Sequence, residues 1–171
     1  FMRLHMSDPN LNPIRLAKEF VKFNERCFVR LLGDMHSSNF VIDVTPDFEE
    51  THYRIRAIDF DQQCYESKKS IYLPQYFKEN NALIQLGMDV ITPESMHQYQ
   101  REERALIATR VKSSHLELED ILQTMESDQL APQSHVDQLK TELAKHYQTK
   151  DFLKCSSMGE ILRKSLSLVS R

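Results

Sequence analysis

The chain has 171 residues, of which 40% are hydrophobic and 27% are charged, and its formal net charge is -3. This length suits one ordinary domain with a real core. Capture of phosphate backbones or lipid headgroups needs clustered Lys and Arg side chains, and no stretch approaches the roughly 20 apolar residues of a membrane helix, so we expect neither a nucleic-acid partner nor a membrane partner.

The cysteines and the N-terminus indicate where the protein works. Three cysteines lie far apart and form no Cys-x-x-Cys pair, which argues against a zinc ribbon and against a disulfide framework. The N-terminus has no signal-peptide pattern. We therefore expect reduced thiols in a cytoplasmic protein. Because the chain begins with Phe1 and not with an initiator Met, we also expect a fragment, or a processed or engineered start.

The first predicted element is a helix that begins at Pro13. Residues 1–12 are polar and contain the turn signal Asp8-Pro9-Asn10, so they are predicted to be a lead-in. Asn12 is a suitable N-cap and Pro13 suits the first helical position. An apolar stripe with helical spacing then continues to Phe28, and the apolar run that follows stops at Gly33.

A β-hairpin is predicted next. The segment 40–44 is apolar and β-branched, and the segment 52–58 alternates strictly, as a half-buried strand does. Residues 45–51 between them hold turn residues, which predicts a fairly long hairpin loop.

The remainder is predicted to be irregular up to residue 78 and helical from 79 to 171. Thr92-Pro93-Glu94 is typical of a helix start. Three apolar stripes with helical spacing follow, which we expect to be core or interface faces: Leu118, Ile121, Leu122 and Met125; Val136, Leu139, Leu143 and Tyr147; Ile161, Leu162, Leu166 and Val169. The predicted organisation is a catalytic-loop and metal-loop core over 13–78 and a C-terminal helical subdomain over 79–171.

The chemistry-bearing residues lie in two short segments on either side of the hairpin. The first reads Leu-Gly-Asp-Met-His-Ser-Ser-Asn over 32–39, and the second reads Ala-Ile-Asp-Phe-Asp over 57–61. This arrangement is similar to the aminoglycoside phosphotransferase and choline kinase group of the protein-kinase-like fold, whose loop reads H-G-D-x-H-x-x-N and whose metal segment reads I-D-[FW]. The similarity covers residues 14–66. It implies a mainly α chain with a small β-hairpin: the C-terminal lobe of a protein-kinase-like fold, whose parent is α+β, without the N-lobe.

The resemblance implies ATP- and Mg²⁺-dependent phosphoryl transfer to the hydroxyl of a small-molecule acceptor. Asp34 would be the catalytic base, and Asn39 and Asp59 would hold the metal. The residue types suit this chemistry, because phosphoryl transfer is mainly positioning and charge neutralisation, and Mg²⁺ prefers hard oxygen ligands. His36 and Asp61 are the cofactor-binding candidates.

Each of three candidate residues also has an ordinary structural interpretation. His36 could be a polar loop residue that bonds nearby backbone, and Asp61 could cap the next turn. Asp34 could be an Asx residue that stabilises a turn.

The sequence departs from the family pattern in the part that grips ATP. Leu32 stands where the family has its first His, and Ser37-Ser38 replaces the usual Pro-Gly. With three glycines in the chain, there is no glycine-rich nucleotide loop, and no strand Lys pairs with a helix Glu. We therefore expect an N-lobe to be a missing partner, and we expect this chain not to work alone.

Two other functions compete with this prediction. One is a non-catalytic, pseudokinase-like or helical interaction module, which the missing N-lobe favours. The other is a metallophosphoesterase, which the Gly-Asp-Met-His segment resembles superficially. A di-metal phosphoesterase site, however, needs a G-N-H-[DE] element and further histidines downstream, which the sequence lacks.

Overall fold

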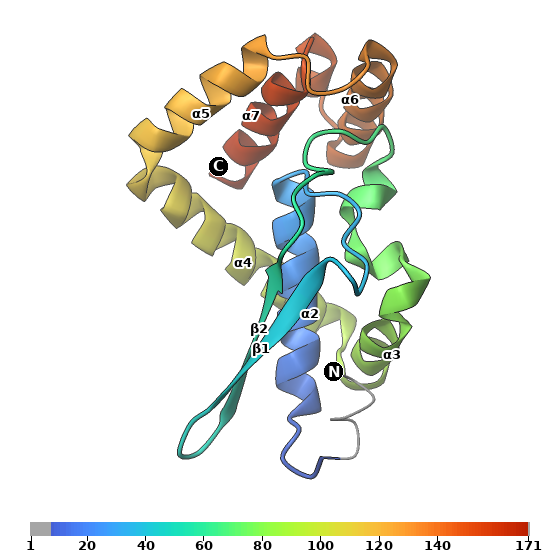
Figure 1. Ribbon diagram of the computed structural model, residues 1–171, viewed down its shortest axis with the longest axis vertical. Coiled ribbons are helices and arrows are strands. Elements are labelled where there is room, and N and C mark those ends of the chain that lie inside the picture. Colours follow the sequence, from blue (N-terminus) through green and yellow to red (C-terminus); the bar gives the residue numbers. More distant parts are fainter. Residues whose placement is uncertain (1–7, 171) are drawn as a thin grey trace.

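The computed structural model describes residues 8–170, which are mostly helical and contain one two-stranded antiparallel sheet (Figure 1). The prediction of a mainly α chain with a small hairpin is therefore confirmed. In chain order the elements are α2 (Pro13–Val29), β1 (Phe40–Pro46), β2 (Thr51–Ala57), the 3₁₀ turns η1 (Lys69–Tyr72), η2 (Pro74–Tyr76) and η3 (Lys78–Asn80), α3 (Asn81–Val90), α4 (Pro93–Ser113), α5 (His115–Ser127), α6 (Gln133–Tyr147), η4 (Asp151–Lys154) and α7 (Met158–Val169).

Helix α2 runs through the middle of the molecule (Figure 1). Its start is as predicted: the Asn12 side chain accepts a hydrogen bond from the Arg15 amide at 3.1 Å, and Pro13 is the first helical residue. The turn predicted at 8–10 also forms, since Asp8 accepts the amide of Asn10. Helices α3, α4 and α7 and strand β2 all pack against α2, so this helix connects the two hydrophobic cores of the described chain.

The hairpin is longer than predicted and its loop is shorter. Pairing runs from Phe40 opposite Ala57 to Pro46 opposite Thr51, so only residues 47–50 form the turn. A proline can end β1 because both strands of a two-stranded sheet are edges, where a missing amide donor costs little. The strict alternation predicted for β2 is confirmed by burial of Ile55 between exposed Arg54 and Arg56.

The segment between the hairpin and α3 has only short 3₁₀ turns, as predicted. It nevertheless packs tightly, because the Tyr72 ring is fully buried and its hydroxyl donates to the Glu66 carbonyl at 2.6 Å. Residues 62–80 therefore form an ordered wall beside the loop that follows α2.

The C-terminal helices bury their apolar stripes to different degrees. Those of α6 and α7 enter one core together with the end of α2, whereas the other core joins α2, the hairpin and α3. The α5 stripe is only partly covered: Leu122 is 4% exposed but Ile121 is 56% exposed. Over residues 8–170, no helix combines the length and apolarity needed to cross a bilayer.

Candidate functional site

The loop that carries Asp34 follows α2 and contains two residues with a left-handed backbone conformation. Leu31 has φ 51° and Asp34 has φ 61°, a region that costs an L-residue about 1–2 kcal/mol and that Asp tolerates better than Leu. Surrounding bonds hold this conformation: the Leu32 amide donates to the Cys27 carbonyl at 2.9 Å, and the Cys64 amide donates to the Leu31 carbonyl at 2.8 Å.

Backbone bonds to the 62–80 wall fix the next residues. The Gly33 amide donates to the Gln62 carbonyl and the Asp34 amide to the Ile71 carbonyl, both at 3.2 Å. The Asn80 side chain donates to the Met35 carbonyl at 3.0 Å. Leu32 is buried and forms a backbone bridge with Gln63. Main-chain pairing thus braces the loop at this position.

Asp34, His36 and Asn39 lie together within this loop. The Asn39 Nδ2 donates to the Asp34 carbonyl at 2.7 Å, and it lies 3.3 Å from His36 Nε2. His36 Nε2 is 3.8 Å from Asp34 Oδ2, and Nδ1 accepts the Ser38 amide at 3.3 Å. A neutral His36 ring can accept the Ser38 amide at Nδ1 or the Asn39 amide at Nε2 but not both, because one of its two nitrogens carries the proton.

The Asp34 carboxylate accepts no backbone hydrogen bond from residues 8–170. It lies 3.8 Å from His36 Nε2, and the Asp34 side chain is 43% exposed. A turn-stabilising Asx residue would instead use its carboxylate to accept a backbone amide. The side chain is therefore open to a molecule from solvent.

The end of the hairpin brings Asp59 to the same loop. The Ile58 amide donates to the Asn39 carbonyl at 2.9 Å, directly beyond the Phe40–Ala57 pair. Asp59 Oδ1 accepts the Asp61 amide at 3.0 Å, so the next turn is capped by Asp59 and not by Asp61. The Asp61 side chain is exposed, and the structure joins it to none of the other four candidates.

The chemistry of Asn39 and Asp59 fits a Mg²⁺ ion. One oxygen of each side chain, Asn39 Oδ1 and Asp59 Oδ2, forms no hydrogen bond within the described chain. An amide and a carboxylate oxygen are hard ligands, and Mg²⁺ keeps its other positions for water and phosphate. Within residues 8–170 no group of three or more His, Cys, Asp or Glu side chains could hold a metal.

Two ionisable groups are buried in the wall behind the loop, the Cys64 thiol and the Tyr72 hydroxyl. Burial raises the pKa of the Cys64 thiol to about 12. Burial, and then the neighbouring Cys64 and Glu66, also raise the pKa of the Tyr72 hydroxyl. Neither buried group therefore ionises near neutral pH.

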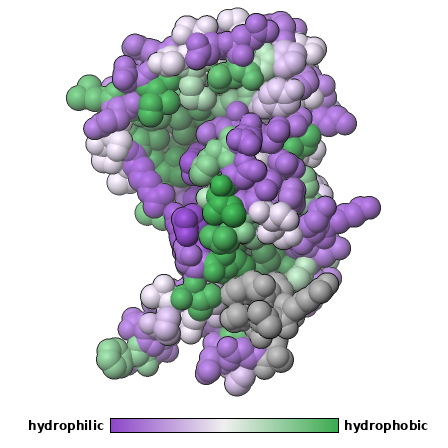
Figure 2. All heavy atoms as spheres, in the orientation of Figure 1, coloured by the Kyte–Doolittle hydropathy of each residue, from purple (hydrophilic) through white to green (hydrophobic). Residues whose placement is uncertain are grey.

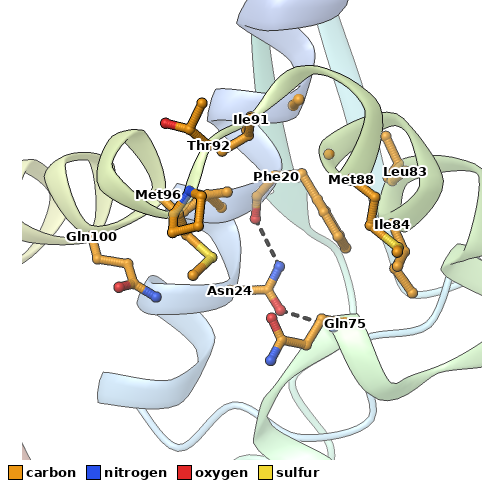
Figure 3. A pocket seen from close by; sticks show the side chains of 14 residues that line it. Phe20, Asn24, Gln75, Leu83, Ile84, Met88, Ile91, Thr92, Met96 and Gln100 are labelled. Atoms are coloured by element: carbon orange, nitrogen blue, oxygen red, sulfur yellow. Dashed lines mark hydrogen bonds between the residues drawn. The ribbon is translucent and has the colours of Figure 1, made fainter.

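A separate apolar cavity of about 260 Å³ lies between α2, α3 and α4 (Figure 3). The apolar side chains that line it include Phe20, Leu83, Ile84 and Met88 on one side and Met96 on the other. The Asn24 side chain in its wall is already used, because it donates to the Phe20 carbonyl and accepts the Gln75 amide, both at 2.8 Å. No charged residue and none of the five predicted site residues lines this cavity.

Sequence reasoning missed the residues that brace the loop from the wall, namely Gln62, Ile71 and Asn80. Two of them act through backbone carbonyls, for which side-chain identity gives no signal. Asn80 is 2% exposed and bonds both Met35 and Pro74, yet a lone Asn near a helix start looks like an ordinary turn residue.

Comparisons with protein-family models, with curated proteins and with solved structures found no match to this chain.

Proposed function

We propose that this chain carries the base and metal half of an ATP- and Mg²⁺-dependent phosphotransferase that acts on the hydroxyl of a small-molecule acceptor, in a C-terminal lobe of the protein-kinase-like fold. The observation that carries the proposal is the hydrogen bond from the Ile58 amide to the Asn39 carbonyl. It holds the end of the hairpin, with Asp59, against the loop that contains Asp34. Residues separated by the whole hairpin thus share one small region, as a pre-organised site requires.

Each side chain has a specific role in this proposal. Asp34 orients the acceptor hydroxyl and finally accepts its proton. This role is supported by its exposed carboxylate, which accepts no backbone hydrogen bond from the described residues. Asn39 and Asp59 hold Mg²⁺ through their unbonded oxygens. Magnesium bound there would supply neutralisation of the negative charge on the phosphate oxygens. His36 holds the loop by bonding Ser38 and contacting Asn39.

The apolar residues beside Asp59 support a further lobe that grips ATP. Ile58 is 52% exposed and Phe60 is 49% exposed, one on each side of Asp59. Exposed apolar side chains next to charged site residues favour contact with another protein surface. In this proposal an N-lobe covers them and supplies the ATP contacts that this sequence lacks.

A non-catalytic binding module is the second candidate. One observation favours it: the partly uncovered apolar stripe of α5, which lies outside the candidate site. A metallophosphoesterase has no such support, because the described residues contain no cluster of His and Asp for two metals.

The test uses the complete gene product that contains this sequence. Isothermal titration with ATP, with and without Mg²⁺, is expected to show Mg²⁺-dependent binding. Asp59→Asn should weaken that binding at least about tenfold, or about 1.4 kcal/mol. Asp34→Asn should leave binding in place but slow phosphoryl transfer by about 10²–10⁴-fold, the range for loss of a general base.

Asp89→Asn is the matched control, because Asp89 is an exposed carboxylate on α3 that bonds only Gln85. It should bind Mg²⁺ and ATP as the unmodified protein does. The proposal fails if the unmodified protein binds ATP equally well without Mg²⁺, or does not bind it, or if Asp59→Asn changes nothing while thermal melts show that every variant is folded.

A further inference from the structure

A groove of about 380 Å³ opens between α4, α5 and α7, beside the C-terminal end of α2. In Figure 1 these helices surround the upper left of the molecule, and in Figure 2 hydrophobic side chains gather beneath α5 on the same face. The apolar lining includes Ile107, Leu118, Ile121, Leu122, Met125 and Leu166. Its volume is within the range of about 300–1,000 Å³ that small-molecule sites occupy.

The groove leaves apolar surface uncovered that the neighbouring helices bury. Ile121 is 56% exposed, while Leu139 of α6 and Ile161 of α7, which belong to comparable stripes, are fully buried. Burial of apolar surface contributes about 25 cal/mol per Å², so a bound apolar chain would gain free energy here.

The charged residues that line the groove are all arginines. Arg26, Arg30 and Arg110 are in the lining, and no Asp or Glu is. Arg26 is already balanced, because its guanidinium is 2.6 Å from Glu19 and 3.6 Å from Glu103. Arg30 and Arg110 are exposed and form no ion pair with any described residue. In a chain of net charge -3, this groove is a local positive site.

The positive region continues beyond the groove toward the hairpin. Arg54 of β2 lines a smaller adjoining cavity together with Arg26 and Arg30. Burial, and then the charges of Arg26 and Arg110, lower the pKa of the Arg54 guanidinium, although Glu19 and Glu103 act the other way. Arg26 is 6% exposed and is paired within the protein, because its Nη1 lies 3.6 Å from Glu103 Oε1. The two unpaired guanidinium groups, of Arg30 and Arg110, are therefore the ones open to an anionic partner.

We infer that this groove binds a free single-chain carboxylate amphiphile, with the apolar chain against α5 and α7 and the carboxylate at Arg30 and Arg110. The polar side chains Gln63 and Ser114 at the same groove can add hydrogen bonds to the head. Gln63 is already held in place, because its Nε2 donates to the Arg30 carbonyl at 3.1 Å. This binding does not depend on the proposed phosphotransfer, whose residues do not line the groove.

The experiment titrates decanoate into the full chain labelled at the isoleucine methyl groups and follows the signals by NMR. Ile107 and Ile121 line the groove, whereas Ile84 and Ile91 line the apolar cavity beside α3. We expect decanoate to shift the first pair and to leave the second pair unchanged. 1-Decanol and decylammonium, with a neutral and a cationic head, should bind at least tenfold more weakly than decanoate.

The decisive variant is the double substitution Arg30→Gln and Arg110→Gln, which removes two positive charges from the groove. Its matched control is Arg101→Gln with Lys112→Gln, which removes two charges from exposed positions of α4 that do not line the groove. The first variant should lose decanoate affinity at least tenfold and the second less than twofold. Thermal melts of both variants check that the fold is retained.

Five results would overturn the inference. Decanol could bind as tightly as decanoate, or the Arg30 and Arg110 variant could keep full affinity. Decanoate could shift Ile84 and Ile91 instead. Finally, sedimentation could reveal a dimer that Ile121→Glu dissociates, which would assign the groove to a second copy of the chain. Binding to phosphatidylglycerol vesicles that the arginine variant abolishes would likewise assign it to a membrane surface.

Discussion

Position 33 requires glycine because the Gln62 carbonyl lies close to it, and not because of its own backbone angles. Its φ is not positive, whereas that of Asp34 is. A Cβ at position 33 would lie 2.9 Å from the Gln62 carbonyl oxygen and 3.4 Å from the Tyr72 ring. The same carbonyl accepts the Gly33 amide, so a side chain at this position would disturb the bond that holds the loop.

We therefore expect Gly33→Ala to destabilise the protein by about 1–3 kcal/mol, the usual cost of inserting an atom into a filled site. Urea unfolding followed by circular dichroism measures this change. Ser37→Ala, an exposed position in the same loop, is the control and should stay within about 0.5 kcal/mol. Equal stability of Gly33→Ala and the unmodified protein would show that the wall can move away from the loop.

At the scale of the elements, the helix starts follow from local chemistry. Thr92 Oγ1 accepts the Ser95 amide at 3.2 Å at the start of α4, and the Ser157 hydroxyl accepts the Glu160 amide at 3.2 Å at the start of α7. Such caps act within four residues, so the start of α4 could be predicted from the sequence. How closely two helices approach is set by residues far apart in the chain.

Gly87 and Gly159 test this difference between local and tertiary effects. A Cβ at Gly87 in α3 would meet nothing within 4 Å, whereas one at Gly159 in α7 would lie 2.4 Å from the backbone at Met125 and Glu126 in α5. We expect Gly87→Ala to stabilise the fold by about 0.5–1 kcal/mol, because alanine favours a helix more than glycine. We expect Gly159→Ala to destabilise it by about 1–3 kcal/mol by overpacking.

Thermal and urea unfolding of the two variants side by side measures both effects. Each variant is the control for the other, since the chemical change is the same. Destabilisation by Gly87→Ala, or no effect of Gly159→Ala, would contradict the helix packing described here.

At the scale of the whole molecule, one buried charged cluster joins three elements. Arg26 Nη2 on α2 donates to Glu19 at 2.6 Å and to the Ile55 carbonyl of β2 at 2.9 Å, and Glu19 accepts the Ile55 amide at 3.0 Å. Glu103 of α4 is 1% exposed and lies 3.6 Å from Arg26 Nη1. The hairpin, α2 and α4 are thus held in register by groups that are costly to bury alone.

We expect Arg26→Met to cost about 3–5 kcal/mol, because it leaves the Glu19 and Glu103 carboxylates buried without their cation. Adding Glu103→Leu to that variant should restore part of the loss, since one uncompensated charge is then removed. Unfolding in urea gives both free energies. Arg101→Met, at an exposed position of α4, should change stability by less than about 0.5 kcal/mol. A loss below 1 kcal/mol for Arg26→Met would show that this cluster does not stabilise the fold.

The sequence by itself determined the features that depend on near neighbours. Helix α2 begins at Pro13, β2 alternates around Ile55, and the chain becomes helical beyond Asn80, because caps and periodic burial act over a few residues. The closeness of Asp34 and Asn39 also follows from their spacing within one loop. Their roles in phosphoryl transfer stay a prediction that the proposed experiments test.

Only the tertiary structure decided which distant groups meet. The bond between Ile58 and Asn39, the wall that braces Gly33, and the ion pair of Arg26 with Glu103 each join positions that no local pattern connects. The same holds for α5, whose stripe resembles that of α7 in sequence but remains partly open beside Arg30 and Arg110. The physical reason is that the sequence of a helix defines which apolar face is available for burial, whereas the packing of the other helices determines how much of that face is covered.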